Sequence, residues 1–367
     1  MFQNWLKPVD PATVSPSHCE DYQIGKNLSI YQEELPDLNQ THVALIGIGA
    51  NEADAVRKEL YPLSFPFKNL SLADLGNLRK NEVPFIIPLI KELLDSKIFP
   101  IIIGNDPLHM LAQYKAFQSL QQVISLIVID EKIRYHEQRK TQSDYYLNDI
   151  LKGQKSRLFH LGLIGCQAHF IDLTHLELLE KRHFECIRLG KAHGDLPEIE
   201  PIIRDGDLLS FNLAAIKQVE APGQSRATPS GFSLDEACQI SRYAGMSDKL
   251  KSFGVYGYRK ANDRKMQTAQ AIAQMIWYFL DGYYNRKNDY PVSNEGLVEY
   301  IVEFKNQEYQ LTFWKSKRSG RWWMQIPVKT KRKYQRHRLI PCSYNDYKLA
   351  GQGDLPERLL NALRRFA

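Results

Sequence analysis

The residues with the clearest chemical potential lie in the stretch "SLIVIDEKIRYH", residues 125–136. The apolar run 126–129 predicts a buried strand, and Asp130 follows directly at its carboxyl end, where open α/β sheets usually place their functional groups. A carboxylate in this place can bind a metal ion. Yet the positions two and four residues further on, where other ligands are expected, hold Lys132 and Arg134. The stretch therefore predicts either a degraded metal site or a charge network.

Polar residues also follow two other predicted strands. The stretch "IIIGNDPLHM" offers Asp106 and His109, and "LLSFNL" ends near Asn212. Divalent ions need several oxygen or imidazole ligands at about 2 Å. Asp106 and Asp130 are the carboxylates that we place at strand tips, so the supply of ligands is small. These residues alone give weak support to a metal centre.

The elements that must position these residues alternate along the chain. Apolar strand patterns occupy 42–49, 70–76, 99–106, 123–130, 159–166, 207–213 and 252–258, and amphipathic helical segments lie between several of them. Ser233 and Asp263 precede two further helices, and the second of these has an apolar stripe that can cover a sheet. This alternation predicts an α/β fold of three layers, with a mostly parallel central sheet and helices on both faces.

Composition limits the class of protein. The chain has 367 residues with 43% hydrophobic content, enough for a substantial core. No apolar stretch approaches the roughly 20 residues of a membrane helix, and the N-terminus lacks the features of a signal peptide. Five cysteines without a CxxC pair argue against a disulfide framework and a zinc site. We expect a soluble, cytoplasmic protein without a membrane partner.

Three regions of the chain differ in composition and in the pattern of apolar residues. We expect an irregular lead at 1–40, an α/β domain at 41–290, and a C-terminal basic β-hairpin extension with a terminal helix at 291–367. Lys315 to Arg338 contains ten Lys or Arg and no acid, so a chain of net charge +6 carries −4 elsewhere. Aromatic residues alternate with these cations, a composition that suits nucleic acid. The simpler interpretation is that the rings dock the hairpin while the cations face water.

Four stretches occur in the order of a known family: "PIIIGNDPLHMLAQYKAF", "LIVIDEKIRYH", "DLLSFNLAAI" and "APGQSRATPSGFSLDEACQISRYAG". Over residues 43–284 the chain resembles the arginase, agmatinase and formimidoylglutamase family. The resemblance implies the three-layer arginase-like fold, assembly as a homo-oligomer such as a trimer or hexamer, and a dinuclear manganese centre that hydrolyses guanidino or formimino groups.

The family's metal ligands can be placed on this sequence. Its G-G-D-H-S loop resembles residues 104–108, so that the ligating His corresponds to Pro107. Its D-A-H-x-D motif resembles residues 130–134, in which Asp130 is retained while Lys132 and Arg134 replace ligands. Two positive side chains in place of a His and a carboxylate would repel metal ions.

The third motif and the substrate position differ as well. The family's S-x-D-x-D motif resembles residues 210–214, where Asn212 and Ala214 stand in place of both carboxylates. The glutamate that would bind the substrate's guanidinium corresponds to about Gly257. Asp130 is thus the one residue that matches a family ligand, and without the metals no group in these motifs activates water comparably.

We therefore expect a pseudoenzyme that needs no cofactor. Lys132 is expected to pair with Asp130, because same-side residues two apart at a strand end can meet, and Arg134 to join a network that includes Asp106. The first alternative is a metal-dependent hydrolase of linear amidines that keeps manganese through misplaced ligands such as His109 or His136. The second is an anion- or polyanion-binding protein, with Lys132 and Arg134 holding a small carboxylate or phosphate, or with the basic C-terminal segment holding nucleic acid.

Overall fold

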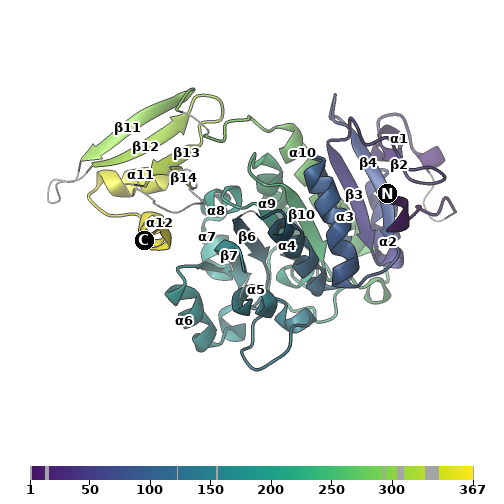
Figure 1. Cartoon of the computed structure of the whole chain (residues 1–367), viewed down its shortest axis with the longest axis horizontal. Helices are drawn as coiled ribbons and strands as arrows, with labels where there is room; N and C mark the ends of the chain where they lie inside the picture. The colour runs from purple at the N-terminus through teal and green to yellow at the C-terminus, as the bar shows by residue number, and fades with distance from the viewer. Residues whose placement is uncertain are drawn as a thin grey trace.

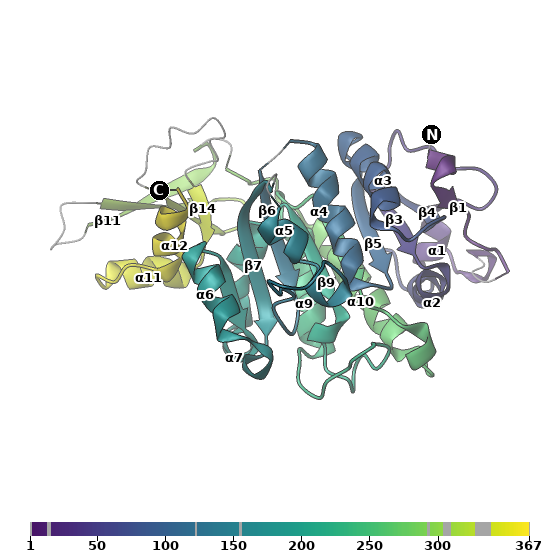
Figure 2. The ribbon, with the colours of Figure 1, turned by 60° about the horizontal axis from the view of Figure 1, so that its bottom comes forward.

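The computed structural model describes residues 2–12, 16–121, 123–153, 156–291, 294–303, 310–326 and 339–366. These residues form a large α/β domain and a smaller C-terminal module, defined here as residues 297–366 (Figure 1). The module lies at the opposite end of the molecule from the N-terminus (Figures 1 and 2). In the described part of the chain, no helix has the length and apolar character needed to cross a bilayer.

The large domain is built on one sheet, which has ten strands among the described residues. Its strands are β1 (Leu6–Lys7), β2 (Ser29–Ile30), β3 (Val43–Ile48), β4 (Leu72–Leu78), β5 (Phe99–Gly104), β6 (Ile124–Ile129), β7 (Leu158–Cys166), β8 (Glu185–Arg188), β9 (Leu208–Asn212) and β10 (Ser252–Tyr256). They lie in the order β1-β4-β3-β5-β10-β9-β6-β7-β8, with β2 also on β4, and all pairs except β1–β4 are parallel. The predicted α/β class with a mostly parallel sheet is confirmed.

Helices cover both faces of this sheet and build two apolar cores. One face carries α2 (Ala50–Leu60), α7 (Leu189–Gly194), α8 (Glu200–Arg204), α9 (Leu234–Met246) and α10 (Gln267–Tyr284). The other carries α3 (Val83–Asp95), α4 (Met110–Ser119), α5 (Asn148–Lys152) and α6 (Leu173–Lys181). A short helix, α1 (Ile24–Asn27), lies in the lead. Every residue of β6 is buried, as a strand covered on both faces requires.

Short 3-10 helices connect several of these elements. They are η1 (Phe2–Asn4), η2 (Pro16–His18), η3 (Pro107–His109), η4 (Ser143–Tyr145), η5 (Ala168–Phe170), η6 (Leu196–Ile199), η7 (Leu213–Ala215) and η8 (Lys260–Asn262). The lead at 1–40 was expected to be irregular, but it contributes β1 and β2 to the main sheet. Strand β8 was not predicted either.

Side-chain caps fix the starts of two long helices. Ser233 and Glu236 form a reciprocal capping box at the start of α9. The carboxylate of Asp263 accepts hydrogen bonds at 3.0 Å from the backbone N–H groups of Thr268 and Ala269, so it caps α10 from a position ahead of Gln267. Both residues that were read as helix starts therefore serve that role.

The C-terminal module contains a second, antiparallel sheet with its own apolar core. Its strands are β11 (Leu297–Glu303), β12 (Gln310–Ser316), β13 (Trp322–Gln325) and β14 (Leu339–Cys342), followed by α11 (Tyr344–Gly351) and α12 (Glu357–Phe366). The predicted hairpin is β11–β12, and its "KNQE" turn lies outside the described residues. Six of the ten basic residues between 315 and 338 also lie outside them.

A buried arginine joins the module to the large domain. The guanidinium of Arg204, in α8, stacks over the ring of Trp323 at 4.5 Å and donates hydrogen bonds to the carbonyl oxygens of Trp322 and Cys342. Arg321 donates to the carbonyl oxygen of Met246 in α9. These described aromatic and basic side chains therefore serve the contact between the two parts of the chain.

Candidate functional site

The sheet order brings the polar strand ends together. Strands β5, β10, β9 and β6 are consecutive neighbours, so that their carboxyl ends meet at one edge. Gly257 directly follows β10 with a φ of 91°, and a Cβ added there would lie 2.9 Å from Oδ1 of Asn212 and 3.6 Å from Cγ of Pro107. The structure thus places Pro107, Asn212 and Gly257 in contact. A side chain at position 257 would be strained both by this space and by the backbone.

Asp130 directly follows β6 at this edge of the sheet and is completely buried. Its carboxylate accepts hydrogen bonds from Nε of Arg134 at 2.7 Å and from Nη2 at 3.3 Å. It also accepts from the hydroxyl of Tyr146 at 2.7 Å, from Nδ2 of Asn212 at 2.8 Å and from the backbone N–H of Glu131 at 2.7 Å. We call these five residues the Asp130 cluster. Protein donors thus satisfy both carboxylate oxygens of Asp130.

The expected pair between Lys132 and Asp130 is wrong. Nζ of Lys132 lies 3.3 Å from the carboxylate of Asp144, at η4. Arg134 takes the position against Asp130 and also reaches Asp144, with Nη1 at 3.0 Å. The reason is that β6 ends at Ile129, so the residues after Asp130 no longer alternate between the faces of a strand.

Burial sets the protonation of the cluster. Desolvation, reinforced by the charge of Asp130, raises the pKa of Glu131 to about 7, although Arg134 opposes this shift. Desolvation alone would lower the pKa of Arg134, but the adjoining Asp130 more than compensates and raises it above its ordinary value. Burial alone would raise the pKa of Asp144, but the nearby charges of Lys132 and Arg134 outweigh this effect and lower the pKa. Glu131 is therefore the carboxyl of this cluster that burial shifts toward neutral pH.

Asp106 organises the neighbouring loop. One carboxylate oxygen accepts from the backbone N–H of Leu108 at 2.8 Å and so caps η3, which begins at Pro107. The other accepts from the hydroxyl of Ser143 at 2.8 Å and lies 3.7 Å from Nη2 of Arg259. Asp106 thus connects η3 to η4. Its expected pairing with Lys132 or Arg134 is replaced by these contacts.

The hydrogen bonds to the Asp130 carboxylate described above come from residues other than the two candidate histidines, His109 and His136. His109 is buried, and its burial lowers its pKa to about 4 despite nearby Asp106. The backbone N–H of His136 donates to the side chain of Asn148, and its ring accepts from the backbone N–H of Gln138. Among the described residues, no group of three or more His, Cys, Asp and Glu side chains is arranged to hold a metal ion.

The donor set does not fit a pair of manganese ions. Pro107 and Ala214, two positions marked by the family resemblance, have no side-chain donor. Asp130 already receives a guanidinium, a phenol and an amide, and its lone pairs would have to be released before an ion could bind. The side chains at this end of the sheet therefore bind one another through hydrogen bonds and ion pairs, which leaves the Asp130 carboxylate without a free position for an ion.

Two residues of this site could not be predicted from the sequence. Tyr146 and Asp144 reach Asp130 and Arg134 from a loop ahead of α5, which no strand or helix period marks. The adjacent "SDYY", residues 143–146, is the local signal, since it gathers a hydroxyl, a carboxylate and two phenols just after the charged stretch.

Comparison with solved structures shows that the large domain has an arginase-like fold. A Trypanosoma cruzi formiminoglutamase solved with Mn²⁺ superposes with a TM-score of 0.64 and 15% identity, over 73% of this chain and all of that chain. A Bacillus subtilis formimidoylglutamase gives 0.60 and 16% over 70% of this chain and 95% of its own. A hypothetical agmatinase from Burkholderia thailandensis gives 0.59 and 19%, covering 70% and 90%. No family model and no curated protein matches the sequence.

Proposed function

We propose that this chain is a non-catalytic protein of arginase fold that acts by binding. The observation that carries the proposal is the occupation of the Asp130 carboxylate by Arg134, Tyr146 and Asn212. A carboxylate held in this way is a structural ion-pair partner, and it is no longer free as a metal ligand.

Electrostatics supports the same proposal. Hydrolysis of an amidine by this fold, in the way that the resemblance implies, needs a metal-activated water. The positive charges of Lys132 and Arg134 stand within a few ångströms of Asp144 and Asp130 and already neutralise them. Added divalent ions would therefore meet a balanced site without spare negative charge.

The test is metal binding together with hydrolysis. Purified protein is dialysed against manganese, bound metal is measured by elemental analysis, and release of ammonia, formamide or urea is followed with formimino-glutamate, agmatine and arginine. A formimidoylglutamase such as the Bacillus subtilis enzyme is the positive control. We expect substoichiometric manganese and no product above the metal-free blank. Two ions per chain with turnover of any of the substrates would overturn the proposal.

Small anions are the second candidate ligands for this site. Lys132 and Arg134 together hold one carboxylate, that of Asp144, whose side chain is 36% exposed. A free carboxylate or phosphate can take its place only by displacing Asp144. In an Asp144→Asn variant we expect acetate or phosphate to raise the melting temperature more than in the parent protein. An equal response to the anions in both proteins would argue against this candidate.

A further inference from the structure

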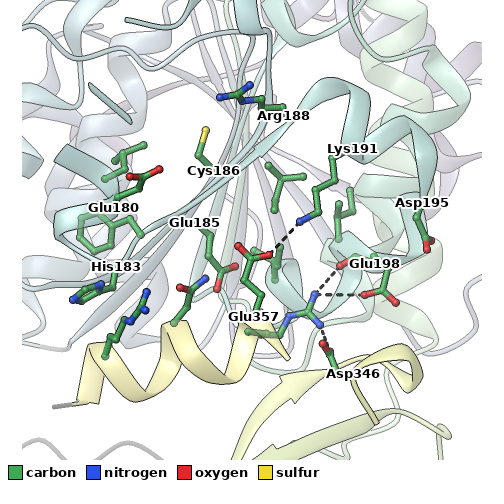
Figure 3. Close-up of a pocket in the computed structure, with 18 of the residues that line it drawn as sticks. Glu180, His183, Glu185, Cys186, Arg188, Lys191, Asp195, Glu198, Asp346 and Glu357 are labelled. Carbon is green, nitrogen blue, oxygen red and sulfur yellow. Dashed lines mark hydrogen bonds and ion pairs between the residues drawn. The ribbon is translucent and has the colours of Figure 1, made fainter. Parts of the chain in front are cut away.

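Strand β8 ends the main sheet, and within the described part of the chain no strand pairs with its outer edge. A cavity of about 680 Å³ lies along this edge (Figure 3). Glu185, Cys186, Ile187 and Arg188 all line it. Because successive strand residues point to opposite faces, a cavity lined by all four must follow the edge itself and reach the backbone. We call this cavity the β8 groove.

The walls of the β8 groove come from the two helical layers. Leu176 and Phe184 lie on the side of α6, and Ile199 and Ile202 lie on the side of η6 and α8. These layers extend beyond the last strand and leave a slot between them. An added extended chain would place alternate side chains against these two apolar walls, as the next strand of a sheet would.

Helix α12 closes the outer side of the groove. Glu357, Arg358, Asn361 and Arg364 line the cavity from successive turns of this helix (Figure 3). Ion pairs of Glu357 with Lys191 and of Arg365 with Glu185 join α12 to the inner side of the groove. A flat sheet edge of a second copy would have to displace all of α12, whereas a single extended segment can enter beside the helix once the exposed Lys191–Glu357 pair opens. The geometry therefore favours a peptide strand over edge-to-edge pairing of two copies.

One end of the groove is acidic. Arg358 forms ion pairs with Glu198 and Asp346, and Asp195 lines the groove beyond Glu198 (Figure 3). Asp195 is exposed, and burial together with Asp346 and Asp195 raises the pKa of Glu198. The whole lining carries six carboxylates, Glu180, Glu185, Asp195, Glu198, Asp346 and Glu357, against four cations, Arg188, Lys191, Arg358 and Arg364, which leaves an excess of negative charge.

We propose that the β8 groove binds an extended peptide segment that adds as a strand to β8 and directs a Lys or Arg side chain to the acidic end. Backbone hydrogen bonds to the free edge would supply the affinity, and the acidic end would select for charge. The β8 groove uses none of the residues of the Asp130 cluster, so the proposal does not depend on whether that cluster binds a metal.

The experiment uses fluorescence polarisation with the full chain. The probe is a fluorescein-labelled heptapeptide of alternating Lys and Val, and its counterpart has Glu in place of Lys. We expect the Lys peptide to bind about tenfold or more tightly than the Glu peptide, a difference of about 1.4 kcal/mol. Hydrogen exchange with the bound peptide should slow at the amides of β8.

Two further comparisons test the mode of binding. In a strand, alternate N–H groups point to the same side, so N-methylation of the Lys amides and of the Val amides should have unequal effects, one of them lowering affinity about tenfold. Asp195→Lys should weaken binding, whereas Glu177→Lys, at an exposed carboxylate of α6 outside the cavity lining, is the matched control.

Several results would overturn the proposal. They are absence of saturable binding of the Lys peptide, equal effects of the two methylation patterns, and identical affinities in the Asp195→Lys and Glu177→Lys variants. Dimerisation in sedimentation experiments that protects β8 and that the peptide does not reverse would assign the edge to a second copy instead.

Discussion

Two buried aspartates of the main sheet have nearly the same surroundings. Asp74 in β4 accepts from Nε of Arg57 at 2.7 Å and from Nη2 at 2.9 Å, from the hydroxyl of Tyr61 at 2.9 Å and from the N–H of Gly76 at 2.9 Å. Asp130 also accepts from an arginine fork, a tyrosine hydroxyl and a backbone N–H. Both carboxylates are fully buried.

The difference between the two clusters is their outer partner. Arg57 is fully buried, and its other hydrogen-bond partners, Asp54, Asn77 and the carbonyl oxygen of Gly76, also lie inside the protein. Arg134 instead reaches Asp144, which is partly exposed. The Asp74 cluster, formed by Arg57, Asp74, Tyr61, Asp54 and Asn77, lies between α2 and β4 and needs no catalytic explanation.

The comparison teaches that the Asp130 cluster has the chemistry of a structural ion pair located where an arginase fold is expected to keep its metals. If this is correct, both Arg57 and Arg134 should stabilise the fold. Arg134, whose cluster is more exposed, should contribute less to the free energy of unfolding than Arg57. The predictions that follow separate the two clusters, from the largest expected effect to the smallest.

Replacement of Arg57 by Met should give the largest loss of stability. It leaves the buried Asp74 without its countercharge, and removal of one member of a buried pair costs about 3–5 kcal/mol. Urea unfolding followed by circular dichroism measures this loss. Lys58→Met, at the exposed neighbouring position of α2, is the control and should change stability by less than about 0.5 kcal/mol.

Replacement of Arg134 by Met should cost about 3 kcal/mol, at the lower end for a buried pair. Asp130 keeps its hydrogen bonds from Tyr146 and Asn212, which limits the loss. Arg139→Met, at an exposed site in the same loop, is the matched control. A loss no larger than in this control would show that the pairing with Asp130 does not stabilise the fold, and would contradict the comparison.

Replacement of Glu131 by Gln should make the protein more stable at neutral pH. The folded pKa of about 7 lies above the ordinary value of 4.5, so the folded state holds this proton more firmly than the unfolded chain. Below pH 4.5 the parent and variant should differ little. Between pH 4.5 and 7 the parent should lose up to about 3 kcal/mol relative to the variant, and above pH 7 the difference should stay constant.

Unfolding of both proteins in urea at a series of pH values measures this effect. Glu137→Gln, which removes an exposed carboxylate nearby, provides the reference. A Glu131→Gln difference that is flat from pH 4 to pH 8 would mean that Glu131 is already ionised in the folded protein.

Replacement of Lys132 by Met should have the smallest effect, below about 1 kcal/mol, because its pair with Asp144 is partly exposed. The effect should shrink further when the salt concentration is raised, since salt screens exposed pairs. A loss as large as that of Arg134→Met would restore the idea that Lys132 neutralises the buried centre.

The central strands could be predicted because their apolar runs match burial on both faces. The family resemblance marked Pro107, Asn212 and Gly257 as site positions, and the structure places these three residues in contact. Strand β8 was missed because "ECIR" mixes a thiol with two charges at the sheet edge. The two-residue strands β1 and β2 are too short for any period. The ion-pair partner of Lys132 depends on the direction of its side chain. This direction could not be predicted because β6 ends at Ile129 and the alternation of a strand no longer applies beyond it.

The contacts of the Arg204 guanidinium determine how the large domain and the C-terminal module unfold on heating. The guanidinium stacks on Trp323 and binds carbonyl groups of the C-terminal module while it remains part of the large domain, and its burial lowers its pKa. Truncation after Gly296 would leave this cation facing water beside an uncovered apolar surface. The two parts should therefore unfold as one cooperative unit, with a single calorimetric transition.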